Sequence, residues 1–514
     1  MKALKGLMIY IGIVFGIIFA IAVLLFGIMY FAPNFRLFGV GVTHANEEIK
    51  GEPIEFSDYT GYDSIELSLS SNKVPVIVTA SSEVTDIEYK LVLATFGISF
   101  DITEYRVSKV VEVKDSVLKV ALSVTEPNGW ISMGGSKVAV TVPANKTYAL
   151  VLNTKSADIS LGSTTSNELK ISKLTATTGS GNLKYIKNEE DENDRNVTLS
   201  SLNLTTGSGE MNFSQVATLS VTAPIKLSAD RGSFVFNDIV GSLDIRGTGV
   251  SFVAENVSCD SNGFTFMSEN GKFKVNNLSS PNGAENTIIT DTCSVEVVTL
   301  SGKTGIITTS GSINIEEAKD DTILQSEHGA IHVNKALKDI NILTHYGNIT
   351  VDSYLRNATF TSKRGNIVVN STGEYEQGLV THIENVDGNI EVINKVNKLR
   401  IKTLGSSKVT VTFEEVKNSL TAATTFEHSV QLHDKGSAVV YLPAIISEPF
   451  KFKATGNISG SISGLGNEDY MGNTVVADED YQYYPNNSQT NIDKSSLSCY
   501  FLFHGTIEFK SYTR

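Results

Sequence analysis

Three histidines lie close together in the sequence, and imidazole is a common ligand of metal ions in proteins. His328, His332 and His345 fall within two adjacent repeats of the chain, and Glu327 precedes the first of them. A zinc site needs three or four side chains that converge on one point. His328 lies one residue before a repeat glycine and His345 two residues before the next, so we expect their side chains to face opposite ways. The sequence therefore predicts no metal site.

A polysaccharide lyase or hydrolase would need carboxylates or basic side chains that converge from neighbouring coils. The position that faces outward between two core residues can be followed from coil to coil. It carries Lys274, Glu296, Asn314, His332, Thr350, Val368, Glu391, Thr410 and Gln431. No two neighbouring positions of this column are both acidic. Only Lys274 and Glu296, at its start, place a basic residue beside an acidic one. We predict that the chain has no catalytic residues and is not an enzyme.

Cofactor sites are not indicated either. Gly302-Lys303-Thr304 is only a fragment of a phosphate-binding loop. Cys259, Cys293 and Cys499 are odd in number and widely spaced, which excludes a dense disulfide framework and a four-cysteine zinc site. The formal net charge of −14 argues against a nucleic-acid partner. We predict no cofactor and no nucleic acid.

The elements that must position these side chains are set by a repeat. Four short segments of the form Gly-x-Ile-x-Ile/Val have glycines spaced 18 residues apart. Those glycines are Gly311, Gly329, Gly347 and Gly365. A small hydroxyl residue stands three positions before each glycine and an apolar residue five before it. Each unit therefore reads as strand, turn and strand, and we expect the turn to need a positive φ at the glycine.

Stacking of such units would bury an apolar column that no unit can bury alone. The expected column consists of Ile313, Ile331, Ile349 and Ile367. Looser copies of the phrase occur before and after this run, for example at Gly209 and at His428–Leu432. The predicted fold is all-β, a parallel β-solenoid (β-helix) of about 18–23-residue coils.

An apolar stretch of 26 residues without charge, residues 7–32, lies near the N-terminus. As a helix it would span about 39 Å, enough to cross a hydrocarbon core of about 30 Å. Lys2 and Lys5 precede it and favour a cytoplasmic N-terminus. We expect an uncleaved signal anchor; a signal peptide cleaved after Thr43-His44-Ala45 is the alternative.

These patterns divide the chain into six segments. They are a cytoplasmic N-terminus (1–6), a transmembrane signal anchor (7–32), a juxtamembrane spacer (33–55), an N-terminal β cap (56–145), the solenoid repeats (146–434) and a C-terminal continuation with a cap (435–514). The acidic stretch Lys187–Asn196 is expected to be an excursion loop, and it lacks the ligand spacing of an EF-hand.

The repeat phrase resembles a known family. Strands that end in Val142-Pro143, followed by copies of Thr-x-Ser-Gly-Asn/Ser-Ile-x-Val, are similar to the bacterial putative-adhesin family. The segment Thr308–Ile315 matches the phrase most closely, and the resemblance covers about Ile65 to Phe509. The resemblance implies a β-solenoid domain of unknown biochemical function, found on secreted and membrane-anchored envelope proteins. It supplies no catalytic residues.

The expected function is that of a non-enzymatic, membrane-anchored cell-envelope protein. It would present an elongated β-solenoid outside the cell for adhesion or envelope interactions, with a cell-surface glycan or an envelope protein as its partner. Two alternatives remain open: a sensor or regulatory ectodomain in envelope-stress signalling, and a polysaccharide-active β-helix enzyme. The expected location is the cell membrane, with a single pass and the bulk of the chain outside the cytoplasm.

Overall fold

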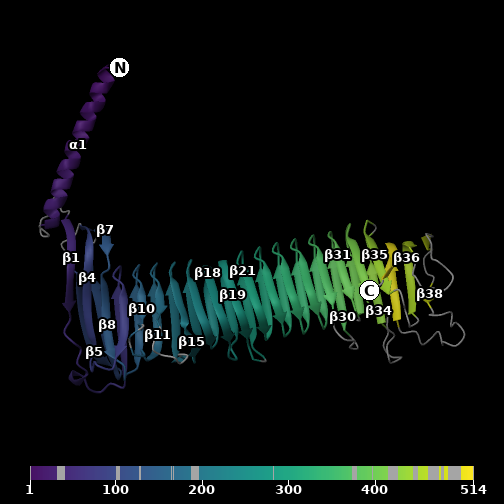
Figure 1. Cartoon of the computed structure of the whole chain (residues 1–514). Helices are drawn as coiled ribbons and strands as arrows, with labels where there is room; N and C mark the ends of the chain where they lie inside the picture. Colours follow the sequence, from purple (N-terminus) through teal and green to yellow (C-terminus); the bar gives the residue numbers. More distant parts are fainter. Residues whose placement is uncertain are drawn as a thin grey trace. The chain divides into compact units, whose positions relative to one another are not determined.

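The fold consists of one helix followed by β-strands (Figure 1). The computed structural model describes residues 2–31, 41–99, 105–126, 129–163, 165, 167–186, 196–281, 283–372, 379–395, 398–414, 426–433, 435–443, 450–460, 474–475, 480–483 and 499–512. The chain divides into two compact units. Unit 1 comprises Met1–Ala223 with Gly232–Asn237, and unit 2 comprises Pro224–Arg231 with Asp238–Arg514.

Helix α1 (Lys2–Phe31) coincides with the predicted apolar stretch. Its side chains are described mainly from Gly12 to Leu25, where large apolar residues such as Phe15 and Phe19 are exposed. Within the described residues, no helix combines the length and the apolar character that a membrane crossing needs.

Unit 1 is built from parallel strands that stack in two rows. The first row runs in the order β6 (Val117–Thr125), β2 (Ser64–Ser71), β9 (Tyr148–Thr154), β11 (Ile171–Thr178) and β14 (Ser201–Thr206). The second runs β8 (Lys137–Pro143), β3 (Val76–Ser81), β10 (Ile159–Leu161), β12 (Leu183–Tyr185) and β15 (Glu210–Val221). Parallel stacking thus already includes strands near residue 64, and β2 lies between two strands that follow it in the sequence.

Antiparallel strands cover the outer edge of these rows. Strand β4 (Glu88–Ser99) pairs with β8, and β5 (Arg106–Lys114) pairs with β6. Strands β1 (Gly41–Lys50) and β7 (Gly129–Gly134) extend the sheet on β4 (Figure 1). Because an uncovered edge would expose unpaired backbone groups, these strands close the first coil. The remaining elements of unit 1 are the 3-10 turn Phe56–Asp58, β13 (Asn196–Leu199) and the first residues of β17 (Ser233–Val240).

Unit 2 continues the same construction with more regular coils. Its early strands are β16 (Ile225–Ala229), β18 (Leu243–Ser258), β19 (Phe264–Ser279), β20 (Glu285–Thr290), β21 (Ser294–Ser301) and β22 (Lys303–Thr308). The regular coils follow as β23 (Ile313–Ala318), β24 (Thr322–Ser326), β25 (Ile331–Ala336), β26 (Ile340–Thr344), β27 (Ile349–Tyr354), β28 (Ala358–Ser362), β29 (Ile367–Ser371) and β30 (Val380–Asn385).

The later strands of unit 2 end the stack. They are β31 (Ile390–Asn394), β32 (Lys398–Thr403), β33 (Lys408–Phe413), β34 (Phe426–Gln431), β35 (Ser437–Pro443), β36 (Phe450–Gly460), β37 (Thr474–Val475), β38 (Asp480–Tyr483), β39 (Cys499–His504) and β40 (Thr506–Tyr512). Strands β39 and β40 continue the two parallel rows, and β36 pairs with both of them. Strand β38 is antiparallel to β36.

The predicted apolar column is confirmed in register. Ile331 lies beside Ile313 on one side and beside Ile349 on the other, and Ile367 follows Ile349. All four side chains are at most 1% exposed. Farther along, Ile390 follows Ile367 after 23 residues, which is the upper end of the expected range of coil lengths. Other coils are longer than expected, since 28 residues separate Lys173 from Ser201 and 29 separate Val409 from Ala438. A buried ladder of one residue type fixes the register, because a slip by one position would expose every member.

The repeat glycines are required for a different reason from the one that the sequence suggested. None of the four has a positive φ, so that expectation was wrong. A Cβ atom at Gly347 would instead overlap the carbonyl oxygen of Gly329 in the preceding coil, and one at Gly365 would overlap that of Gly347. Close contact between successive turns, rather than backbone conformation, therefore selects glycine.

The hydroxyl residue three positions before each repeat glycine forms a hydrogen bond with the backbone of that glycine. Ser326 Oγ accepts a hydrogen bond from the Gly329 N–H at 2.8 Å, and Ser362 Oγ accepts one from Gly365 at the same distance. Both serines are buried. Thr308 accepts in the same way from Gly311, whereas Thr344 Oγ1 donates to Gly347 O at 2.8 Å. The hydroxyl of each of these four coils thus pairs with a backbone group of its own turn.

Cys293 occupies a turn position where the repeat has glycine elsewhere. Its side chain is fully buried, and burial raises the pKa of its thiol to about 11. Cys259 and Cys293 are both free thiols. The side chain of Cys499 and most of the acidic stretch (187–195) lie outside the described residues.

Candidate functional site

The histidines singled out in the sequence are partly brought together. Glu327 Oε1 lies 4.0 Å from His328 Nε2 and 3.8 Å from His345 Nδ1. The expectation that His328 and His345 face opposite ways was therefore wrong. Both residues lie in turns beyond the strand ends, where the alternation of side chains along a strand does not apply. His332 lies apart on β25, and its Nε2 is 3.0 Å from Asp352 Oδ2.

These contacts do not form a metal centre. Across the described parts of the chain, no group of three or more His, Cys, Asp and Glu side chains is placed to hold a metal ion. Glu327 contacts two histidines and Asp352 contacts one, and all of these side chains are at least one-third exposed. The arrangement suits surface recognition of a ligand better than chelation.

The outward column of unit 2 follows the predicted order for eight members. Lys274 lies beside Glu296, and the pairing continues residue by residue to Thr410. The ninth position was wrong: Val439 follows Thr410, because β35 rather than β34 continues this row. Gln431 instead lies beside Lys402 in the other row.

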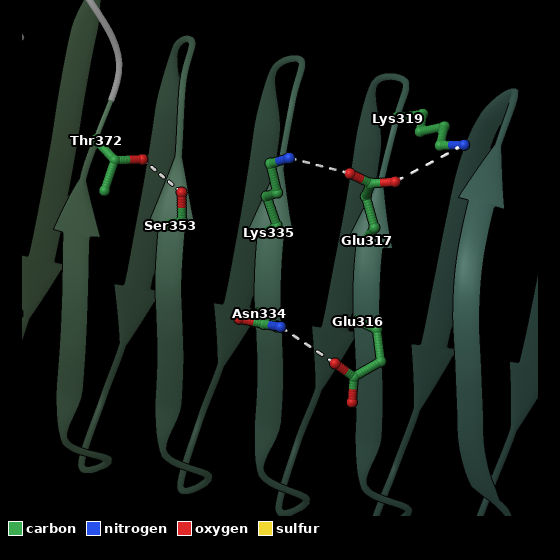
Figure 2. Close-up of polar contacts among 7 residues, drawn as sticks. All are labelled: Glu316, Glu317, Lys319, Asn334, Lys335, Ser353 and Thr372. Carbon is green, nitrogen blue, oxygen red and sulfur yellow. Dashed lines mark hydrogen bonds and ion pairs between the residues drawn. The ribbon is translucent and has the colours of Figure 1, made fainter.

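Polar contacts tie neighbouring coils together on this solvent-facing side (Figure 2). Lys335 Nζ donates to Glu317 Oε1 at 3.2 Å, and the same carboxylate lies 3.7 Å from Lys319. Asn334 Nδ2 donates to Glu316 Oε2 at 3.2 Å. The two hydrogen bonds join positions that are one coil apart, whereas Lys319 lies in the same coil as Glu317. The exposed face therefore carries an ordered ladder of polar side chains.

A different kind of surface occurs at the turns that precede Gly329, Gly347 and Gly365. The two residues before each glycine form the tip of the turn. We call the six residues of these three tips the turn-edge cluster: Glu327, His328, His345, Tyr346, Lys363 and Arg364. Backbone hydrogen bonds hold the tips in register, since the Tyr346 N–H donates to Glu327 O at 2.8 Å and the Arg364 N–H donates to His345 O at 2.9 Å.

Planar side chains stack along the turn-edge cluster. The rings of His328 and Tyr346 are 4.9 Å apart and inclined by only 7°. The guanidinium carbon of Arg364 lies 5.8 Å from the centre of the Tyr346 ring, within the range of a cation–π contact. The ring of His345 meets Tyr346 edge-on at 6.5 Å. Tyr346 nevertheless remains 48% exposed, so the stack presents its edges to solvent.

The sequence contained a signal for this cluster that reading along the chain does not reveal. Tyr346 and Arg364 are 18 residues apart and become neighbours only when the coils are stacked. Aligned on their glycines, the three tips read Glu-His, His-Tyr and Lys-Arg, whereas the preceding tip is Thr309-Ser310. Three successive tips with large charged or aromatic side chains follow a tip with two small side chains. Core packing does not require large side chains at these exposed turns, so the change in residue size marks a surface with another role.

Unit 1 carries a shallow groove of about 480 Å³. Small polar residues from four neighbouring strands line it, including Ser70, Ser123, Asn153 and Thr177. Ser70 Oγ donates to Ser123 Oγ at 3.0 Å, and Lys155 is the one charged side chain of the lining. The groove therefore offers hydroxyl and amide groups but no arrangement of acid and base for catalysis.

One strongly perturbed histidine lies in the core rather than at a surface. His428 is buried, and burial together with the nearby charge of Lys398 lowers the pKa of its imidazole to about 3. The Leu399 N–H donates to its Nδ1 at 3.3 Å, which requires the neutral ring. His428 is a structural acceptor.

Comparison with known proteins gives a partial match. No curated protein matches the chain. A crystal structure of a "putative cell adhesion protein" from Clostridium sporogenes is 11% identical, with a TM-score of 0.17 over 91% of this chain and all of that chain. Residues 103–250 match the Toastrack DUF4097 family.

Proposed function

We propose that the chain is a non-enzymatic, membrane-anchored protein of the cell envelope that displays its solenoid outside the cell for adhesion or envelope interactions. The observation that carries this proposal is the ordered, solvent-facing ladder of polar side chains in unit 2 (Figure 2). A surface of repeated polar groups provides many weak contacts to an extended partner, and many weak contacts bind strongly together.

In this proposal helix α1, which covers most of the apolar stretch of residues 7–32, is the membrane anchor. Apolar side chains that point in different directions around it, such as Ile13, Phe15 and Ile18, are more than half exposed. A helix that is apolar all round must be buried, either in protein or in lipid. Lys2 and Lys5 precede the apolar stretch and favour an N-terminus that stays in the cytoplasm.

The topology can be tested with a C-terminal epitope tag on the full chain in intact cells. Added protease should remove the tag, and extraction of the protein from membranes should need detergent. A variant that lacks residues 7–32 serves as the control and should stay inside the cell. A tag that becomes sensitive only after lysis would contradict the proposed orientation. Release of a soluble form that starts near Asn46 would favour the cleaved signal instead.

Adhesion is tested separately. Cells that produce the full chain should adhere more strongly to polysaccharide-coated wells than cells that produce the variant without residues 7–32. Equal adherence of the two strains, with the full chain exposed at the surface, would contradict a role in adhesion.

A further inference from the structure

We propose that the turn-edge cluster is a binding site for an acidic sugar residue of a polysaccharide. The carboxylate of the sugar would lie on Lys363 and Arg364, and its hydroxyl groups would contact His345, Tyr346 and Glu327. This inference rests on the proposed function, in which the solenoid is a binding surface, and it names the ligand class and the site.

The cationic end of the cluster suits a carboxylate. Lys363 and Arg364 are adjacent and exposed at one tip. A guanidinium presents two parallel N–H donors that match the two oxygens of a carboxylate, and such charge-assisted pairs are strong. Lysine adds a second, less directional positive charge beside it.

The stack holds the arginine in place before a ligand arrives. Tyr346 lies between His328 in the preceding coil and Arg364 in the following coil. The amide row beside the tips is also fixed, because Asn348 Oδ1 accepts from the Asn366 N–H at 2.9 Å. Ordering a flexible arginine on binding costs free energy, so a guanidinium that is already packed on a ring binds at a lower cost.

Acidic groups on either side of the cations argue for a sugar rather than a simple polyanion. Glu327 lies at one end of the cluster, and Asp387 occupies the tip after Arg364. The Asp387 carboxylate accepts hydrogen bonds from Ser406 through its N–H at 3.1 Å and its hydroxyl at 3.2 Å. Carboxylates accept hydrogen bonds from sugar hydroxyls, but they repel the closely spaced charges of a nucleic acid or a heavily sulfated chain.

The dimensions of the cluster also fit. Successive tips are separated by one coil, about 4.8 Å, so the three tips extend over about 10 Å along the stack. This length accommodates one or two sugar rings. The tip before the cluster, Thr309-Ser310, has no charged or aromatic side chain. On that side the surface therefore offers no cationic contact to a longer anionic chain.

The test uses the full chain in detergent with polygalacturonate, a polymer of an acidic sugar, as the probe. Dextran serves as the neutral polymer and dextran sulfate as the strongly charged one. Arg364→Ala should weaken binding of polygalacturonate by about tenfold or more, because it removes a charge-assisted pair. Tyr346→Ala should weaken it by a smaller factor, since the arginine loses its support. Arg364→Lys should recover part of the loss.

Arg246→Ala is the matched control, because Arg246 is also an exposed arginine of unit 2, paired with Asp244 at 2.7 Å. It should leave binding unchanged, and thermal unfolding should show that every variant is folded. Equal loss from Arg246→Ala, or tighter binding of dextran sulfate than of polygalacturonate, would overturn the proposed site. Absence of polygalacturonate binding by the unaltered chain would overturn the ligand class, whereas the adhesion and topology tests would still decide the proposed function.

Discussion

At the scale of single residues, the buried isoleucine column determines whether a coil can form. Ile349 is fully buried between Ile331 and Ile367. Ile349→Asp would place a charge among apolar neighbours on both sides and should cost several kcal/mol, a large part of the stability of a domain. Thermal unfolding of the full chain in detergent measures the effect.

Thr350→Asp is the control for this change, because Thr350 is adjacent in sequence and lies on the outward side between His332 and Val368. It should alter the free energy of unfolding by about 0.5 kcal/mol or less. If the two variants were equally destabilised, the assignment of inward and outward positions would be wrong.

His428 makes stability depend on pH. Its pKa is lowered to about 3 in the folded chain, so the unfolded chain takes up its proton first as pH falls below about 6.5. The folded state should therefore lose up to about 1.4 kcal/mol per pH unit between pH 6.5 and 3.

His428→Gln keeps a hydrogen-bond acceptor for Leu399 but does not titrate. Denaturant unfolding at pH 7 and pH 4.5 should show a smaller loss of stability for this variant than for the unaltered chain. An identical pH dependence would mean that His428 is not the source of the acid sensitivity.

The residue scale also shows what the sequence could reveal. The isoleucine column followed from a strict 18-residue spacing, which places identical side chains one above another. The same 18-residue spacing separates His328, Tyr346 and Arg364, but these three residues differ in type, so no repeated residue marks their stack in the sequence. Their contact arises from the coil geometry alone.

At the scale of elements, the turn glycines are a testable feature. Gly347→Ala would bring a methyl group against the Gly329 carbonyl oxygen, and backbone on both sides leaves little room to move. We expect a loss of about 1–3 kcal/mol, as for overpacking in a core. Gly305→Ala provides the control, because a Cβ there meets nothing within 4 Å.

Urea unfolding of both glycine variants measures the difference. Gly305→Ala should be neutral or slightly stabilising, since alanine restricts the unfolded chain. A harmless Gly347→Ala would show that successive turns can separate without loss, and close contact between turns would then not explain the glycine spacing.

Prediction of the elements succeeded where the repeat is strict and failed where it is loose. Strands β23 to β29 follow the 18-residue rhythm and were predicted in register. Strand β34 was assigned to the outward column that contains Thr410, but it pairs with β32 in the other row. Val430 alternates with polar residues in the same way as the core residues of both rows, so the alternation alone did not distinguish the two rows. The place of β2 between β6 and β9 could not be predicted, since it depends on contacts between strands far apart in the sequence.

At the scale of the whole molecule, each coil is stabilised mainly by its neighbours. In stacked repeats, stability is a sum of local terms and interface terms, so damage should spread to adjacent coils first. Ile349→Asp should therefore increase hydrogen exchange in β25 and β29 more than in β18 and β19 of the same unit. Uniform acceleration throughout unit 2 would indicate instead that the unit opens as one cooperative block.

The regular coils also have a genetic consequence. Ile313, Ile331 and Ile349 occupy equivalent places, and each coil meets the next through the same pairs of positions. An in-frame duplication of 18 codons within this run would insert a further coil whose upper and lower surfaces already match its neighbours. Protein length can therefore change in whole coils by recombination between similar stretches of the gene, while the exposed tips diversify by point mutation with little effect on the core.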